Sequence, residues 1–256
     1  MVRTRVIPCL LLRNMGLVKT RRFKDAVYIG DPINAVRIFN DKEVDELVLL
    51  DINATPDGKR LPFDMLAKVA SQCFMPLCYG GGVRTVEDMA QLYSIGIEKV
   101  ALNSQAVKTP TLVRAAADRF GAQSVIVSID VKKSYFGKYE VVTEGGRKGT
   151  GKDPVRWAAE MQAMGAGELF LNSVDRDGMM EGYDLELIRR VTAAVGIPVV
   201  ACGGAGKLAD LSSVVTAGGA SAAAAGSLFV FQMPHRAVLI NYPSQRDLES
   251  LFCENR

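Results

Sequence analysis

The chain has few of the residues that carry metal, redox or histidine chemistry. Its 256 residues include a single histidine, His235, a single tryptophan, Trp157, and five cysteines. The cysteines form no Cys-x-x-Cys pair, and no Cys/His cluster has the spacing of a zinc site. We therefore expect no metal, no cofactor and no catalysis by histidine. We also expect the cysteines to be reduced, as in cytoplasmic proteins, and Trp157 to pack in the core.

The sequence also has little excess of either charge and no long apolar runs. The 31 lysines and arginines nearly balance the 28 aspartates and glutamates, which leaves a net charge of +3 without a basic run. This balance predicts no nucleic-acid partner. No apolar run is long enough to cross a bilayer, and Arg3 and Arg5 interrupt the short apolar segment at the start. We therefore expect neither a membrane span nor a signal peptide, and a cytoplasmic location.

The sequence contains a repeat at about half its length. Pro76-Leu-Cys-Tyr-Gly-Gly-Gly-Val-Arg84 and Pro198-Val-Val-Ala-Cys-Gly-Gly-Ala-Gly206 are both apolar runs that end in glycines, and their starts are 122 residues apart. Each predicts a buried strand, a tight turn and a helix start, where backbone N–H groups can hold an anion. The repeat therefore predicts a duplicated fold, with halves of about 1–121 and 122–256.

Short apolar strands alternate with amphipathic helices along the chain. Strands are predicted at 5–12, 46–52, 75–79, 99–103, 124–130, 168–173, 197–202 and 221–225. Helices are predicted at 31–40, 61–72, 85–94, 109–119, 153–164, 184–194 and 208–217, with a last one in the tail 233–256, interrupted by Pro243. The stretch 13–30 is expected to be a functional loop, and 137–151 a loop that bears a hairpin. This order predicts one (β/α)8 TIM barrel over residues 1–256, rather than an open doubly wound sheet.

Two pairs of predicted strand ends carry the donors of a phosphate site. Backbone N–H groups of glycines stand there beside a hydroxyl or an amide, which suits a phosphate group. These residues are Gly82, Asn103 and Ser104 in the first half, and Gly204, Gly226 and Ser227 in the second. In a barrel both sets lie at the same mouth, so they predict a ligand with a phosphate at each end. The alternative is that the glycines only form tight turns.

One carboxylate stands where a general acid or base would be expected. Asp130 ends the fifth predicted strand, at the barrel mouth. The equivalent position in the first half is Leu11, which cannot transfer a proton. Asp51 and Asp177 also lie at or just after strand ends. The alternative for Asp130 is that it caps the following turn.

Four charged residues begin strands at the opposite end. Arg5, Glu46, Lys99 and Glu168 supply two cations and two anions. They could form a salt-bridged ring that closes the bottom of the barrel and gates something small moving along its axis. The alternative is that each charge is solvated separately.

Together these residues resemble the HisF family, the cyclase subunits of imidazole glycerol phosphate synthase. The resemblance covers nearly the whole chain and is carried by Arg5-Val-Ile-Pro-Cys-Leu, Gly30-Asp-Pro, Gly80-Gly-Gly, Ser173-Val-Asp-Arg-Asp-Gly178 and Cys202-Gly-Gly-Ala-Gly-Lys207. It implies a barrel docked by its N-terminal face to a HisH-type glutaminase, as a heterodimer. Ammonia made by the glutaminase would pass through the barrel to a doubly phosphorylated substrate.

The resemblance also assigns roles to residues. The family gate of Arg, Glu, Lys and Glu matches the four strand-start charges, and Lys19 matches a lysine of the mobile first loop. Of the two catalytic aspartates of the family, only Asp130 is present. The implied phosphate-binding and substrate-binding residues are Lys19, Asp51, Gly82, Asn103, Ser104, Asp177, Gly178, Gly204, Gly226 and Ser227.

The departures from the family pattern point to a subgroup. Leu11 replaces the first catalytic aspartate, Leu12-Arg13-Asn14-Met15 replaces the usual Val-Lys-Asp-Gly, and Asn172 replaces a threonine. In these features and in Met75-Pro-Leu-Cys-Tyr-Gly the chain resembles the WbuZ-type paralogues. Those are associated with acetamidino modification of bacterial surface sugars, together with a HisH-like glutaminase and a separate sugar amidotransferase.

Three functions follow from this resemblance. The first is a synthase subunit that delivers ammonia for sugar amidation in lipopolysaccharide O-antigen biosynthesis. The second is the cyclase and lyase subunit of histidine biosynthesis. The third is a non-catalytic scaffold that activates the glutaminase.

Overall fold

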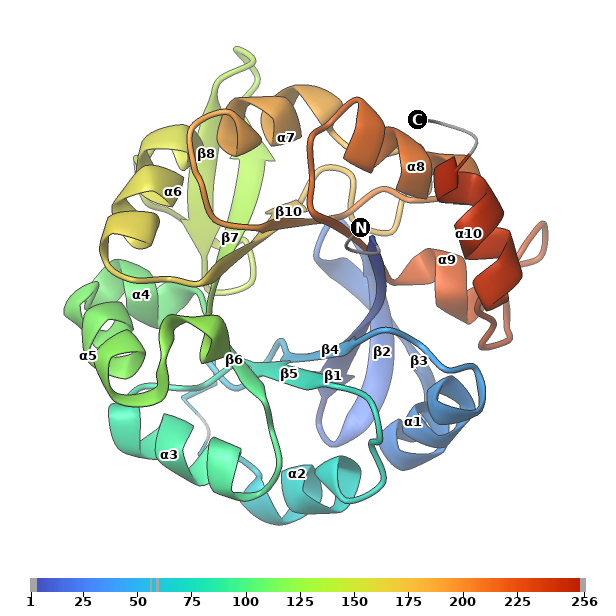
Figure 1. Ribbon diagram of the computed structural model, residues 1–256, viewed down its shortest axis with the longest axis horizontal. Coiled ribbons are helices and arrows are strands. Elements are labelled where there is room, and N and C mark those ends of the chain that lie inside the picture. The colour runs from blue at the N-terminus through green and yellow to red at the C-terminus, as the bar shows by residue number, and fades with distance from the viewer. Residues whose placement is uncertain (1–3, 56, 59, 254–256) are drawn as a thin grey trace.

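Eight parallel strands close into a barrel in the computed structural model, which describes residues 4–55, 57–58 and 60–253 (Figure 1). In chain order they are β1 (Arg5–Arg13), β4 (Leu47–Asp51), β5 (Leu77–Gly80), β6 (Lys99–Leu102), β7 (Val125–Lys133), β10 (Glu168–Ser173), β11 (Val199–Cys202) and β12 (Ala222–Ala225). The last strand pairs with the first, Ala222 opposite Arg5. The predicted (β/α)8 barrel is therefore confirmed. Arg3 and residues 254–256 of the predicted tail lie outside the described residues.

Helices form a ring around the strands (Figure 1). They are α1 (Pro32–Asp41), α2 (Phe63–Ala70), α3 (Val86–Ser94), α5 (Thr111–Phe120), α6 (Pro154–Ala163), α7 (Leu185–Thr192), α8 (Leu208–Thr216) and α10 (Gln245–Cys253). Helix α1 shows why they start where they do: Pro32 occupies its first turn, and the Asp31 side chain accepts a hydrogen bond from the Asn34 N–H. The prediction that Pro243 interrupts the last helix is wrong, because Pro243 precedes α10.

Two hydrophobic layers hold the barrel together. The outer layer lies between strands and helices and includes Trp157, which is 1% exposed, as expected for a packing residue. The inner layer fills the barrel and consists largely of small or aliphatic side chains, such as Ile7, Cys78, Ala101 and Ala224. Alternate strand residues face these two layers because successive side chains point to opposite sides of a strand.

The half-length repeat is visible in the helix starts after β5 and β11. Asp88 in α3 accepts hydrogen bonds from the two backbone N–H groups just before that helix, and Asp210 in α8 does the same. These aspartates are 122 residues apart, the offset of the glycine turns that precede them. Each carboxylate neutralises free N–H groups at a helix start and holds the preceding turn in place.

Several local elements differ from the sequence prediction. The stretch 13–30 is largely a hairpin of β2 (Gly16–Arg21) and β3 (Lys24–Gly30), because β2 pairs with the end of β1. The predicted hairpin in 137–151 is present as β8 (Tyr139–Thr143) and β9 (Lys148–Gly149). Two helices, α4 (Ser104–Lys108) and α9 (Ser227–Val230), and the pair β13 (Phe231–Gln232) and β14 (Ala237–Val238) were not predicted. They are too short to show a hydrophobic period.

Candidate active site

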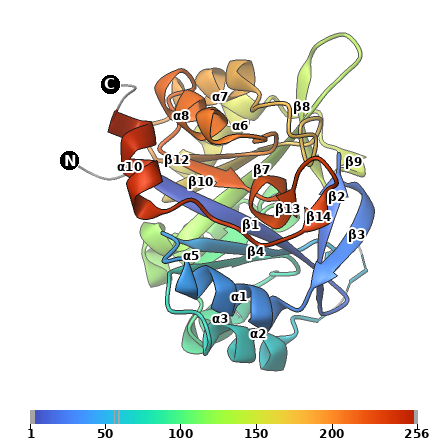
Figure 2. The same cartoon turned by 90° about the vertical axis from the view of Figure 1, so that its right-hand side faces the viewer.

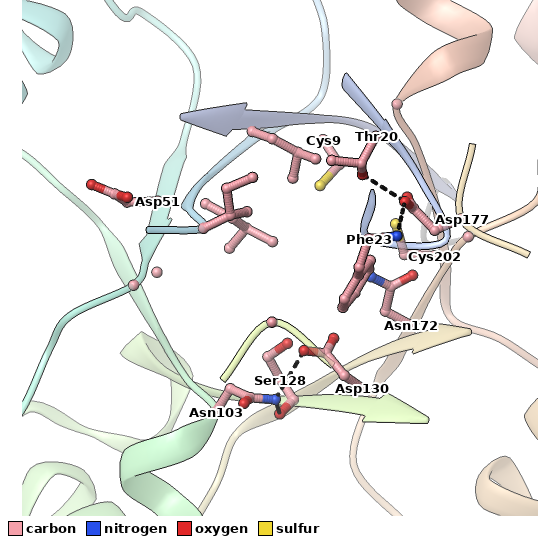
Figure 3. Close-up of a pocket in the computed structure, with 18 of the residues that line it drawn as sticks. Cys9, Thr20, Phe23, Asp51, Asn103, Ser128, Asp130, Asn172, Asp177 and Cys202 are labelled. Carbon is pink, nitrogen blue, oxygen red and sulfur yellow. Dashed lines mark hydrogen bonds between the residues drawn. The ribbon is translucent and has the colours of Figure 1, made fainter. Parts of the chain in front are cut away.

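The carboxyl ends of the barrel strands surround a pocket of about 230 Å³ (Figure 3). Figure 2 shows the β2–β3 and β8–β9 hairpins on this side of the barrel, away from the chain termini. The pocket is lined by Asp130 and by all ten residues expected to bind phosphate or substrate. The tertiary structure thus brings together side chains that the sequence places more than 200 residues apart, at the end of the barrel where such enzymes work.

Asp130 lies at the centre of a row of side-chain amides. The Asn103 amide donates to its carboxylate at 3.2 Å, and Asn172 is its direct neighbour on β10. Burial and the nearby negative charge of Asp177 raise the pKa of Asp130 to about 7, against the smaller lowering by Asn172. A carboxyl with this pKa can both give and take a proton near neutral pH.

Leu11 is the residue that corresponds to Asp130 in the first half of the repeat. Its side chain is 8% exposed and belongs to the inner layer. The other two expected carboxylates of the mouth already accept hydrogen bonds within the protein. Asp51 accepts from the N–H groups of Asn53 and Ala54 at 3.0 Å each. Asp177 accepts from the Thr20 hydroxyl at 2.7 Å and from the Phe23 N–H at 3.3 Å. Both therefore shape the mouth, and Asp130 is the acid best placed for chemistry.

The glycine turns require glycine. Gly82 and Gly204 have φ angles of 75° and 120°, in the region that side chains disfavour. A Cβ atom on Gly204 would lie 2.2 Å from the Gly182 carbonyl oxygen. Close packing of this kind shapes the pocket wall, where the Gly82 N–H donates to the Thr55 hydroxyl at 3.1 Å.

The residues after β6 and β12 begin short helices in matching conformations. Asn103 and Gly226 precede α4 and α9 with φ/ψ of −118°/−88° and −108°/−71°. The buried Ser227 hydroxyl has no hydrogen-bond partner among the described residues, so it is open to a ligand. In contrast, Ser104 already accepts from the Glu144 N–H at 3.0 Å. The Asn103 amide donates to Asp130 and the Ser128 carbonyl, so it belongs to the acid–base row as much as to a phosphate site.

Lys19 reaches from the β2–β3 hairpin to the floor of the pocket. It is 5% exposed and its ammonium donates to the Cys9 carbonyl at 2.6 Å. It occupies the space above Gly226, where a Cβ atom would collide with its Nζ. The thiols of Cys9 and Cys202 also line this floor. Sequence reasoning missed both thiols, because each lies in an apolar strand and only closure of the barrel brings them together.

At the opposite end, the four strand-start charges form a closed ring. Arg5 contacts Glu46 at 2.5 Å and also contacts Glu168. Lys99 lies 2.9 Å from Glu46 and 3.1 Å from Glu168. Burial alone would lower the pKa of Lys99, but Glu168 and Glu46 outweigh it and hold the pKa above its usual value. Against the effect of burial, the neighbouring carboxylates also raise the pKa of Arg5, so both cations of the ring stay charged at neutral pH.

Uncharged side chains fill the space between this ring and the pocket. They include Ile7, Val48, Ile126, Phe170 and Val200. Such an interior strongly disfavours an ion and tolerates a small neutral molecule. Among the described residues, no group of three or more His, Cys, Asp or Glu could hold a metal. No helix in this described part of the chain has both the length and the apolar character needed to cross a membrane.

Comparison with known proteins identifies the family. The family model described as "Histidine biosynthesis protein" matches residues 5–234. A Pseudomonas aeruginosa protein, provisionally named imidazole glycerol phosphate synthase subunit hisF2, is 51% identical over 97% of this chain and 99% of its own length. A Leptospira borgpetersenii protein with a provisional HisF name is 46% identical over 98% of this chain and all of its own. The imidazole glycerol phosphate synthase subunit HisF of Alkaliphilus metalliredigens is 45% identical over 90% of this chain and 91% of its own length. The chain therefore belongs to the HisF family of imidazole glycerol phosphate synthase subunits.

Proposed function

We propose that this chain is the synthase subunit of a glutamine amidotransferase that supplies nitrogen for sugar amidation in surface-polysaccharide biosynthesis. A HisH-type glutaminase docks at the N-terminal face and releases ammonia there. The ammonia crosses the barrel and leaves at the mouth. One observation carries this proposal. A complete charged ring is followed by an uncharged interior, and the mouth beyond it has one candidate acid–base residue, Asp130, because position 11 is leucine.

The barrel interior distinguishes ammonium from neutral ammonia. The two cations and two carboxylates of the ring balance, so the apolar interior is what excludes ammonium, because the ion would lose its hydration there. Neutral ammonia avoids this cost and can pass when one ion pair of the ring opens. Each carboxylate of the ring contacts both cations, so either cation can move away while its carboxylates keep a partner.

The mouth can hold an anionic ligand and move one proton. The glycine turns at Gly82 and Gly204 belong to opposite halves of the barrel and bound the same pocket. Between them, Asp130, with a pKa of about 7, can take the proton that an attacking ammonia loses. It has no second carboxylate opposite it at position 11.

The second candidate is the cyclase and lyase of histidine biosynthesis. It is favoured by the retained Asp130, by the two glycine turns and by the name of the Alkaliphilus relative. Loss of one member of an acid–base pair typically costs a factor of about 10²–10⁴ in rate. This chain would therefore need another group to replace the missing aspartate.

Reconstitution tests the first candidate. The chain, its glutaminase and the sugar amidotransferase are combined with glutamine, and amidated sugar is measured against glutamate. We expect the product to require all three proteins, and ammonium chloride to replace the glutaminase. Equal product without this chain would show the proposal to be wrong.

Complementation tests the second candidate. If this chain lets a strain that lacks HisF grow fully on medium without histidine, the cyclase is favoured. A Glu46→Ala variant separates delivery of ammonia from a scaffold role, and Glu87→Ala, at an exposed pair with Arg119, is its control. If Glu46→Ala keeps glutaminase docking and leaves product transfer unchanged, the chain is only a scaffold that activates the glutaminase.

A further inference from the structure

The β7–β8 hairpin carries two fully exposed aromatic side chains at its tip. Tyr135 and Phe136 are 99% and 94% exposed, and their rings pack edge to face with centroids 5.7 Å apart. Exposed aromatic pairs of this kind are unusual on a soluble surface and typical of the centre of a binding interface. Figures 1 and 2 both show this hairpin standing out beyond α7.

The hairpin holds the two rings in a defined position. The Ser134 N–H donates to the Lys138 carbonyl at 2.8 Å, and the Gly137 N–H donates to the Ser134 carbonyl at 2.9 Å. At its base, the buried Tyr139 hydroxyl hydrogen-bonds to Asp184 at the start of α7, and Lys133 pairs with Glu186 at 3.3 Å. The tip therefore stands on a fixed support, which lowers the entropy lost on binding.

A hollow with excess positive charge lies at the base of the same hairpin. Its charged lining consists of Lys138, Lys152, Arg156, Arg190, Asp153 and Glu160. Both acids already have partners, since Asp153 caps α6 and Glu160 lies 3.9 Å from Lys152. Within the described residues, Lys138 and Arg156 take part in no ion pair. The surface thus offers an apolar tip beside cations that lack a counter-charge.

We propose that this hairpin surface, made of Tyr135, Phe136, Lys138 and Arg156, docks an acidic protein, namely the enzyme that accepts the nitrogen. This inference rests on the proposed function. Ammonia that leaves an open mouth meets water and becomes ammonium, which is no longer a nucleophile. The accepting enzyme must therefore cover the mouth, and Figure 2 shows the hairpin on that side of the barrel.

The distribution of charge favours a protein over a flat membrane. A bilayer could contact the tip, but the hollow lies at the base of the hairpin. A partner must therefore have a shape that is complementary to both the tip and the hollow. A protein with an apolar cleft for the two rings and acidic residues beside it meets both features. Complementary charge would speed its association and make binding sensitive to salt.

Binding between purified proteins tests this inference. The complex of this chain with its glutaminase is immobilised, and the sugar amidotransferase is titrated by biolayer interferometry. We expect Tyr135→Ser/Phe136→Ser to weaken binding at least tenfold. We expect Lys138→Glu/Arg156→Glu to weaken it similarly and to reduce its salt dependence. Ile38→Ser, which removes an exposed apolar side chain from α1, should bind like the wild type. Glutaminase docking should be unchanged in all variants.

Several outcomes would overturn the inference. The first is that the double aromatic variant binds the amidotransferase as tightly as the wild type does. The second is that the wild type does not bind it. The third is that this chain forms a dimer that the aromatic variant abolishes. Co-sedimentation of the wild type with phosphatidylglycerol–phosphatidylethanolamine vesicles, lost in the aromatic variant without change in amidotransferase binding, would assign the tip to a membrane. The proposed function fails separately, when product forms without this chain.

Discussion

At the scale of single residues, position 11 carries leucine where the half-length repeat leads us to expect a carboxylate. The side chain there belongs to the inner layer and lines the pocket, which Asp130 also lines with a pKa of about 7. One group with a suitable pKa can still transfer a proton, but it cannot act as acid and base on two sides of a ring closure.

Leu11→Asp should restore part of the cyclase chemistry. We expect turnover of the family's doubly phosphorylated substrate, with ammonium chloride as nitrogen source, to rise by about 10²-fold or more. Stability should fall by about 1–3 kcal/mol, because a carboxylate replaces a buried apolar group. Leu11→Asn is the control, since it brings polarity without a proton to transfer. Equal rates for the two variants would contradict the prediction.

Asp130 should make the protein less stable as pH rises through the weakly acidic range. Its carboxyl has a folded-state pKa of about 7, above the unfolded value of about 3.9, so the folded state binds more protons between these limits. Stability should therefore be greatest below pH 4 as far as this group is concerned, and should fall up to about pH 7. The slope cannot exceed about 1.4 kcal/mol per pH unit.

Asp130→Asn removes this titration. Urea unfolding of the wild type and the variant at pH 5 and pH 8 should show the variant gaining relative stability at the higher pH. A constant difference between the two pH values would show that the pKa of Asp130 is not raised.

At the scale of elements, strand ends and the turns that follow them build the pocket. The turn after β5 places Gly82 against Ala54, and a carboxylate in α3 holds the residues that follow. The same device recurs after β11. These turns are positioned by close backbone contact, so they should tolerate no side chain.

Gly82→Ala should weaken the binding of inorganic phosphate at least tenfold, measured by calorimetry. The added Cβ would lie 2.8 Å from the Ala54 Cβ at a φ of 75°, which adds overlap to about 1–2 kcal/mol of backbone strain. Gly151→Ala is the matched control, because its φ is 71° and no atom lies within 4 Å of the added carbon. If both variants bind phosphate like the wild type, this turn is not a phosphate site.

At the scale of the whole molecule, an uncharged interior separates the charged ring at the N-terminal ends of the strands from the polar mouth. This ring also ties together β1, β6, β10 and the start of β4. Glu46 is 2% exposed and contacts both cations, so its charge stabilises the fold as well as closing the axis.

Glu46→Gln should cost about 2–4 kcal/mol in the free energy of unfolding, because Arg5 and Lys99 then share one carboxylate. Glu186→Gln breaks an exposed pair with Lys133 and should cost less than about 1 kcal/mol. Urea unfolding curves of both variants provide the comparison. Similar losses for the two would mean that the ring contributes little to stability.

Most of the fold and much of the site could be predicted from the sequence. Hydrophobic period and glycine position are local properties, and they located the barrel strands, the principal helices and the turns at Gly82 and Gly204. Local patterns also placed Asp130 at the mouth and showed Leu11 in place of its expected counterpart. These features depend on residues within one turn or one strand, so the order of amino acids alone determines them.

Only the tertiary structure decided which side chains meet. Asn172 lies beside Asp130 because β10 and β7 pair in register, and the thiols of Cys9 and Cys202 meet because the barrel closes. The ring is complete because four strands bring their first charges to one axis. The pKa of Asp130 and the exposure of Tyr135 and Phe136 follow from burial, which depends on all neighbours at once and has no signature in a single stretch of sequence.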